Sequence, residues 1–255
     1  METMGPAAPE QTQPASAGSG SALSAVFGVL TSPTKAFSQI KQMKNGPRLL
    51  VPLITLAVIY IIMGVLVYEP STKMQMDLQR DMVERFRNSG NEQVARQIEA
   101  GIKKPPMWQS VLVIGVMFVA VLPIITALLM WLLGNYAFGG KAKFMAVWGL
   151  AAYAGLTFGV GQLVTGLLIA SKGTMTVSLS PAILVAGDGV MTYSYQLLSR
   201  ISIPHIWEII TAGIGLSIMY DFSRNKGMWL SVVSLGTMAV AGFAMAAIQI
   251  MFMRG

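Results

Sequence analysis

His205 and Glu208 are the side chains best suited to chemistry, because they stand three positions apart in a stretch that is otherwise apolar. In a helix, residues i and i+3 share a face, so the imidazole and the carboxylate would lie side by side. An ionisable group inside a membrane span is costly to bury and is therefore a candidate for proton or ion handling. Glu208 lies only about 6 Å along such a helix from Pro204, however, so both side chains could instead anchor the span at the interface. A metal site would need a third ligand, and Asp188, in the loop before this span, is the acid considered for it.

Other catalytic or cofactor-binding patterns are missing from the sequence. No HExxH, GxSxG or paired-aspartate arrangement lies in a membrane span. The chain has no cysteine, which excludes disulfides, thiolate chemistry and cysteine-ligated metals. We therefore expect a protein that is not an enzyme and that holds no cofactor or metal.

The composition is that of a multi-span membrane protein. Hydrophobic residues make up 54% of the 255 residues, charged residues only 11%, and the mean hydropathy is +0.60. A net charge of +7 could indicate a nucleic-acid partner. In a membrane protein, Lys and Arg gathered at cytoplasmic flanks account for the same charge, so we expect contact with the lipid bilayer and none with nucleic acid.

Long runs without charge predict an all-α bundle of five transmembrane spans. The membrane domain covers residues 49–253, with spans at 49–68, 110–135, 144–170, 204–220 and 228–253. An odd number of spans puts the two termini on opposite sides of the membrane. Lys and Arg are denser in segments 31–48, 136–143 and 221–227 than in the segments between them, which predicts a cytoplasmic N-terminus.

The segments outside the spans differ in character. Residues 1–24 are rich in Pro, Ala, Ser and Gly and are predicted to be a disordered tail. Residues 25–48 are basic and half apolar, which is typical of a juxtamembrane helix lying at the bilayer surface. A loop is expected after Tyr68, followed by an amphipathic helical pair over 72–104 with a break at 88–90. This pair is either a solvated hairpin resting on the bilayer or a surface that docks a partner.

Small side chains form a stripe along span 144–170, which we expect to be the hub of the bundle. The stripe holds Ala152, Gly155, Gly159, Gln162 and Gly166 within one narrow arc. A second stripe with the same spacing lies in span 228–253 and holds Ala239, Gly242, Ala246 and Gln249. These spacings suggest that the two spans pack together with each glutamine donating across the interface, or they arise by coincidence in helices rich in Gly and Ala.

Four blocks give the chain a resemblance to a known family. They are LTSPTKAFSQIK, FGGKAKFMAVWGLAAYAGL, LSPAIL and IPHIWEIITAGIGLSIMYDFSRNKG. In this order they resemble the bacterial branch of the Yip/Yif domain family of five-span membrane proteins, over residues 27–250. The resemblance implies a helical bundle with an inward N-terminal region and an address in the bacterial cytoplasmic (inner) membrane. Eukaryotic relatives associate with Rab-type GTPases and with each other, but this chain lacks their DLYGP-type signature, so GTPase binding is not expected.

These observations favour a non-enzymatic scaffold or membrane-organising protein. Its partners would be other membrane proteins or further copies of the chain. The alternative is a small transporter or lipid-moving protein, in which Glu208, Gln162 and Gln249 would line a polar path through the bundle.

Overall fold

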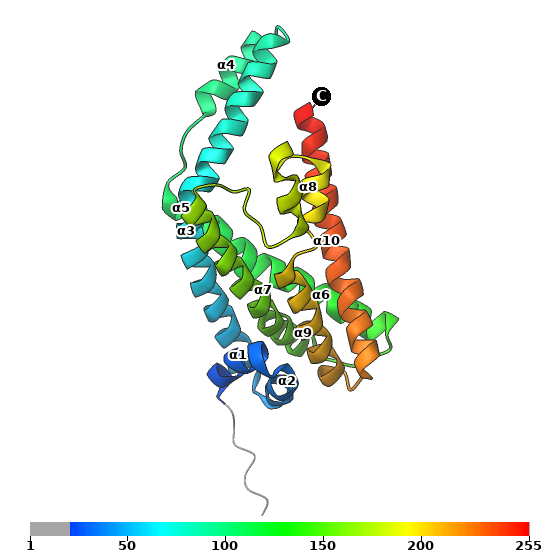
Figure 1. The fold of residues 1–255 in the computed structure, drawn as a ribbon. Coiled ribbons are helices and arrows are strands. Elements are labelled where there is room, and N and C mark those ends of the chain that lie inside the picture. The colour runs from blue at the N-terminus through cyan, green and yellow to red at the C-terminus, as the bar shows by residue number, and fades with distance from the viewer. Residues whose placement is uncertain (1–20, 255) are drawn as a thin grey trace, which may run out of the picture.

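The computed structural model describes residues 21–254, which are folded into helices joined by turns (Figure 1). As predicted, five helical stretches in this range are long and apolar enough to cross a membrane: Asn45–Asn88, Met107–Ala137, Phe144–Lys172, Tyr193–Met219 and Arg224–Phe252. Of the tail predicted for residues 1–24, residues 1–20 lie outside the described part of the chain. Residues 22–24 are already helical, because Ser21 caps the first helix.

The first span is part of one helix, α3 (Asn45–Asn88), that continues well beyond the apolar run. The loop expected after Tyr68 does not form, and that prediction was wrong. Pro70 removes one N–H donor from the helix, but the hydroxyls of Ser71 and Thr72 donate to the Tyr68 carbonyl at 3.0 and 2.8 Å and the helix runs on. The predicted break near residue 89 is present, and α4 (Glu92–Gly101) follows it. The two helices form a hairpin at the top of Figure 1.

The second span is built of four consecutive helical pieces. α5 (Met107–Gly115) runs through a π-helical turn, η1 (Val116–Val121), into α6 (Leu122–Leu132) and a second π turn, η2 (Leu133–Ala137). Pro123 lies at the start of α6, directly after the first π turn. Prolines and π turns are the usual causes of irregularity in long helices. The disturbance that Pro123 introduces is therefore taken up locally, and the span continues.

α7 (Phe144–Lys172) and α9 (Ile203–Met219) form the centre of the bundle. α7 packs against α3 and α9, and α10 (Arg224–Arg254) packs against α9 (Figure 1). Every residue from 211 to 217 in α9 is buried. Gly213 leaves room for Met228 of α10, and Gly215 leaves room for the Phe37 ring. The predicted hub, α7, thus forms the centre of the bundle together with α9, the shortest span.

The small-residue stripe of α7 faces α3. A Cβ at Gly159 would lie 3.2 Å from Leu56, one at Gly166 would lie 3.3 Å from Met63, and Gly155 also faces Leu56. In α10, Gly242 instead faces Arg200. The predicted pairing of the two stripes is therefore wrong. Equal spacing defines a smooth face on each helix, but it does not determine which neighbour that face contacts.

The segment predicted to be one juxtamembrane helix forms two, α1 (Ala22–Thr31) and α2 (Pro33–Gln42). Their apolar faces are buried against the lower end of α7 and α9, with Val29 and Phe37 fully enclosed. The Tyr153 hydroxyl donates to the Ala22 carbonyl at 3.0 Å, and Lys41 pairs with Asp221 at 2.7 Å. The segment thus closes one end of the bundle.

Because the natural chain has no cysteine, helix pairs can be tested by crosslinking in membranes. The variant Leu56→Cys/Gly159→Cys is expected to lose both free thiols on mild oxidation, since these positions are in contact across α3 and α7. Maleimide labelling before and after oxidation measures the loss. The matched pair Gly155→Cys/Gly242→Cys should keep both thiols, and its efficient oxidation would contradict the observed packing.

Candidate functional site

The first turns of α9 carry both ionisable side chains singled out above. Ser202 caps the helix by accepting the His205 N–H at 3.3 Å. Pro204 follows and packs directly on Gly161 of α7, where any Cβ would overlap the proline ring. This contact holds the N-terminus of α9 against α7, and so fixes where His205 and Glu208 enter the bundle.

His205 and Glu208 lie side by side, as their spacing predicts. The His205 Nδ1 atom is 3.4 Å from the Glu208 Oε2 atom. The two side chains are only 19% and 14% exposed, so both are turned into the protein. A protonated imidazole in this position neutralises the carboxylate, which reduces the cost of burying either group.

Aromatic rings from the neighbouring helices surround the pair. The Phe158 ring meets the His205 ring edge-on at 6.0 Å. Glu208 interacts electrostatically with Tyr60 of α3, which is 2% exposed and stacks on Phe118 at 4.8 Å. The His205 Nε2 atom is buried and has no hydrogen-bond partner among the described residues. The pair therefore lies between α3, α7 and α9, close to the aromatic side chains Phe158 and Tyr60.

This arrangement allows two kinds of behaviour. A histidine beside a carboxylate can hold or pass on a proton. The same pair can also be a self-neutralised polar anchor for a short helix. A metal would need more ligands, and no group of three or more His, Asp or Glu side chains able to hold one gathers in the described part of the chain.

The two glutamines of the predicted polar path lie in different surroundings. Gln162 is half-buried on α7, one turn beyond Phe158, and its side chain has no hydrogen-bond partner within residues 21–254. Gln249 lies on α10 and lines a cavity whose walls include neither Glu208 nor His205 nor Gln162. The structure thus brings His205 and Glu208 together and places Gln249 with a separate group of residues.

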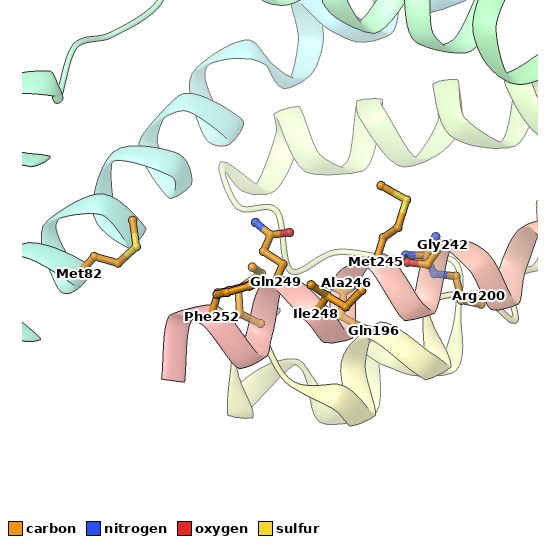
Figure 2. Close-up of a pocket in the computed structure, with 10 residues that line it drawn as sticks. Met82, Gln196, Arg200, Gly242, Met245, Ala246, Ile248, Gln249 and Phe252 are labelled. Carbon is orange, nitrogen blue, oxygen red and sulfur yellow. Dashed lines mark hydrogen bonds between the residues drawn. The ribbon is translucent and has the colours of Figure 1, made fainter. Parts of the chain in front are cut away.

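That separate group contains a residue the sequence analysis passed over, Arg200. Its side chain reaches from the end of α8 (Tyr193–Leu198) to α10, and it borders the same cavity as Gln249 (Figure 2). One signal was available: Arg200 is the only Lys or Arg in residues 173–202. A lone cation among small and apolar residues between two spans is a candidate for a buried role.

Residues 27–247 match the Yip1 domain. The chain belongs to the Yip1 domain family. The match runs from α1 into α10 and includes both the His205–Glu208 pair and Arg200. Yip1 domain proteins are in general non-enzymatic membrane proteins. No curated protein and no solved structure matches the chain.

The contact between Gly161 and Pro204 predicts a large effect from a small substitution. Gly161→Ala is expected to destabilise the purified protein by about 1–3 kcal/mol, because the new methyl group displaces the start of α9. Thermal unfolding in detergent, followed by tryptophan fluorescence, measures this change. Gly155→Ala is the control, since its nearest neighbour, Leu56, would be 4.0 Å away. Equal stability of the two variants would show that α7 and α9 are not in close contact here.

Proposed function

We propose that this Yip1 domain protein is a scaffold that organises other membrane proteins, which it binds through the hairpin of α3 and α4. We further propose that it resides in the bacterial cytoplasmic membrane with its N-terminus in the cytoplasm. Support for this orientation comes from the clustering of Lys and Arg in α2, in the 138–143 turn and in the turn between α9 and α10, at one end of the bundle (Figure 1). The hairpin would then extend from the opposite membrane face.

The shape of the hairpin is the observation that carries this proposal. Beyond Tyr68, α3 continues for about 30 Å at about 1.5 Å per residue. α4 folds back along it and packs on α3, away from the other helices (Figure 1). Val83 and Ala95 are buried where the two helices meet. The protein therefore presents a preformed helical surface outside its transmembrane bundle.

Ion pairs fix the hairpin at both ends. Near the tip, Arg87 bridges Glu92 at 3.8 Å and Glu99 at 3.0 Å. At the base, Lys104 lies 2.7 Å from Glu69, and the hydrogen bond with that carboxylate raises the pKa of Lys104. Such exposed pairs are individually weak, but together they favour one geometry of the hairpin. A defined geometry lowers the entropic cost of binding a partner.

The outer face of the hairpin is suited to a protein partner. It carries acids and bases interspersed along both helices, which does not favour a uniformly charged polymer. Val94 remains 38% exposed on α4, and Arg96 is exposed on another face of the same helix. Mixed charge around an exposed apolar side chain is typical of a transient protein interface.

A charge change on this face tests the scaffold function. Val94→Asp/Arg96→Glu is expected to lower the recovery of a partner crosslinked in intact membranes by about tenfold, as for loss of an interface hot spot. Quantitative mass spectrometry of the affinity-purified protein gives the measurement. Lys172→Glu, a charge reversal at the end of α7, is the control and should leave recovery unchanged. Recovery of the same partners from all three proteins would contradict a binding role for the hairpin.

A transport function is the second candidate, and the unpartnered His205 Nε2 atom favours it. A buried imidazole nitrogen beside a carboxylate could accept a proton arriving through the bundle. The structure supports a transport path only in part. Gln249 lines the cavity beside α8 and α10, away from His205 and Glu208, and aromatic rings pack against the pair. The scaffold therefore remains the preferred function.

Proton flux into liposomes separates the two candidates. If the protein transports protons, the natural chain should acidify dye-loaded liposomes and Glu208→Gln should abolish this flux. Glu69→Gln, which removes a carboxylate outside the bundle, should retain it. A scaffold predicts no flux above empty liposomes for any of these proteins, and flux that depends on Glu208 would overturn the scaffold proposal.

A further inference from the structure

Arg200 is held in place by a contact with the backbone of α10. Its Nη2 atom donates to the Gly242 carbonyl at 3.0 Å. The guanidinium can come this close because Gly242 has no side chain: a Cβ there would lie 2.7 Å from Nη1. The position of the charge is therefore fixed by a specific glycine on a neighbouring helix.

Most of the hydrogen-bonding capacity of Arg200 is unused. A guanidinium has five N–H donors, and the contact with Gly242 uses one. The Nε atom is buried without a partner, and no carboxylate among the described side chains pairs with Arg200. A half-buried cation without a counter-ion is costly, so this site favours an anion from outside the chain.

The space beside the guanidinium is large enough for such an anion. A cavity of about 740 Å³ lies between α8, the outer half of α10 and Met82 of α3. In Figure 2, Gln249 and Met245 extend from α10 into it, with Arg200 at one end and Phe252 at the other. The Gln249 amide has no hydrogen-bond partner in the described part of the chain, so it offers further donors. The cavity is thus cationic at one end, carries the Gln249 amide toward the other end, and is otherwise lined mainly by apolar side chains.

The depth of Arg200 and the surface next to it point to lipid. Gly242 is about 27 Å along α10 from Arg224, and the hydrocarbon core of a bilayer is about 30 Å thick. The guanidinium therefore lies at headgroup level in the leaflet away from α1 and α2. Met245 and Phe252 are 73% and 84% exposed and continue the apolar outer face of α10. An acyl chain would run from the cavity toward the centre of the bilayer, along a part of α10 that exposes Val232, Val233 and Val240.

We propose that the cavity between α8 and α10 binds the headgroup of an anionic phospholipid, with the phosphate hydrogen-bonded to Arg200 and the polar headgroup atoms beyond the phosphate hydrogen-bonded to Gln249. Basic pockets between transmembrane helices are a known way of holding such headgroups. The bound lipid supplies the missing counter-charge and covers the exposed outer end of α10. This site is separate from the His205–Glu208 pair and from the hairpin, so it does not depend on the scaffold function.

Native mass spectrometry of the detergent-solubilised full-length protein tests the proposal. The probes are phosphatidylglycerol, phosphatidylcholine and inorganic phosphate, each titrated separately. The natural chain is expected to retain phosphatidylglycerol in preference to phosphatidylcholine. Arg200→Gln should weaken phosphatidylglycerol binding by about tenfold, as expected for the loss of a charge-assisted hydrogen bond. Lys172→Gln, which removes an equal charge outside the cavity, should bind as the natural chain does.

A second variant keeps the test decisive if Arg200→Gln does not fold. Ala246→Trp leaves the guanidinium in place and fills the cavity, so it should also lose phosphatidylglycerol, while thermal unfolding in detergent shows that it is folded. Equal retention of the two lipids by the natural chain, or unchanged binding in folded Arg200→Gln or Ala246→Trp, would overturn the proposal. If inorganic phosphate binds and abolishes the preference for phosphatidylglycerol, the site binds a soluble anion, and its assignment to a lipid is wrong.

Discussion

Close approach of helix backbones at positions without side chains is the constraint on which this bundle depends. Lipid provides no hydrophobic drive between helices, so stability must come from dense contact. A close approach of two backbones links α9 and α10, where a Cβ at Gly227 would lie 2.6 Å from the Gly213 carbonyl oxygen and from the Ser217 nitrogen. Together with Gly161 beneath Pro204, these contacts enclose α9 on several sides. The N-terminal helix α2 packs against this enclosed helix, and the His205–Glu208 pair lies on it.

The helix α9 is too short to cross a bilayer by itself, and this affects the end of the bundle away from α1 and α2. Its 17 residues span about 25 Å, less than the roughly 30 Å of a bilayer core. The chain before it makes up the difference: α8 packs along the outer half of α10, and the turn that follows carries Arg200. Arg200, which the sequence places in a loop, is thereby brought to the edge of the membrane. The position of Arg200 is thus a product of how a short span is completed.

The sequence predicted the spans well because the bilayer imposes them: a long run without charge has few alternatives to a transmembrane helix. Helix ends were less predictable, since Pro70 reads as a break yet is accommodated within α3. The His205–Glu208 pair could be predicted because its spacing is local. The neighbours of the α7 stripe and the contact between Arg200 and Gly242 could not, because they join residues far apart in the chain and depend on how whole helices pack.

The two buried polar groups of this protein handle charge in opposite ways. His205 and Glu208 lie side by side within one helical turn, so that a protonated imidazole would neutralise the carboxylate, and the Phe158 ring packs against the histidine. Arg200 is secured by a backbone carbonyl, which positions the guanidinium but leaves its charge uncompensated. A histidine beside a carboxylate can serve as an anchor without any ligand. A lone, half-buried cation beside a cavity gains more from an added negative charge, so of the two sites Arg200 is the one that favours a binding partner.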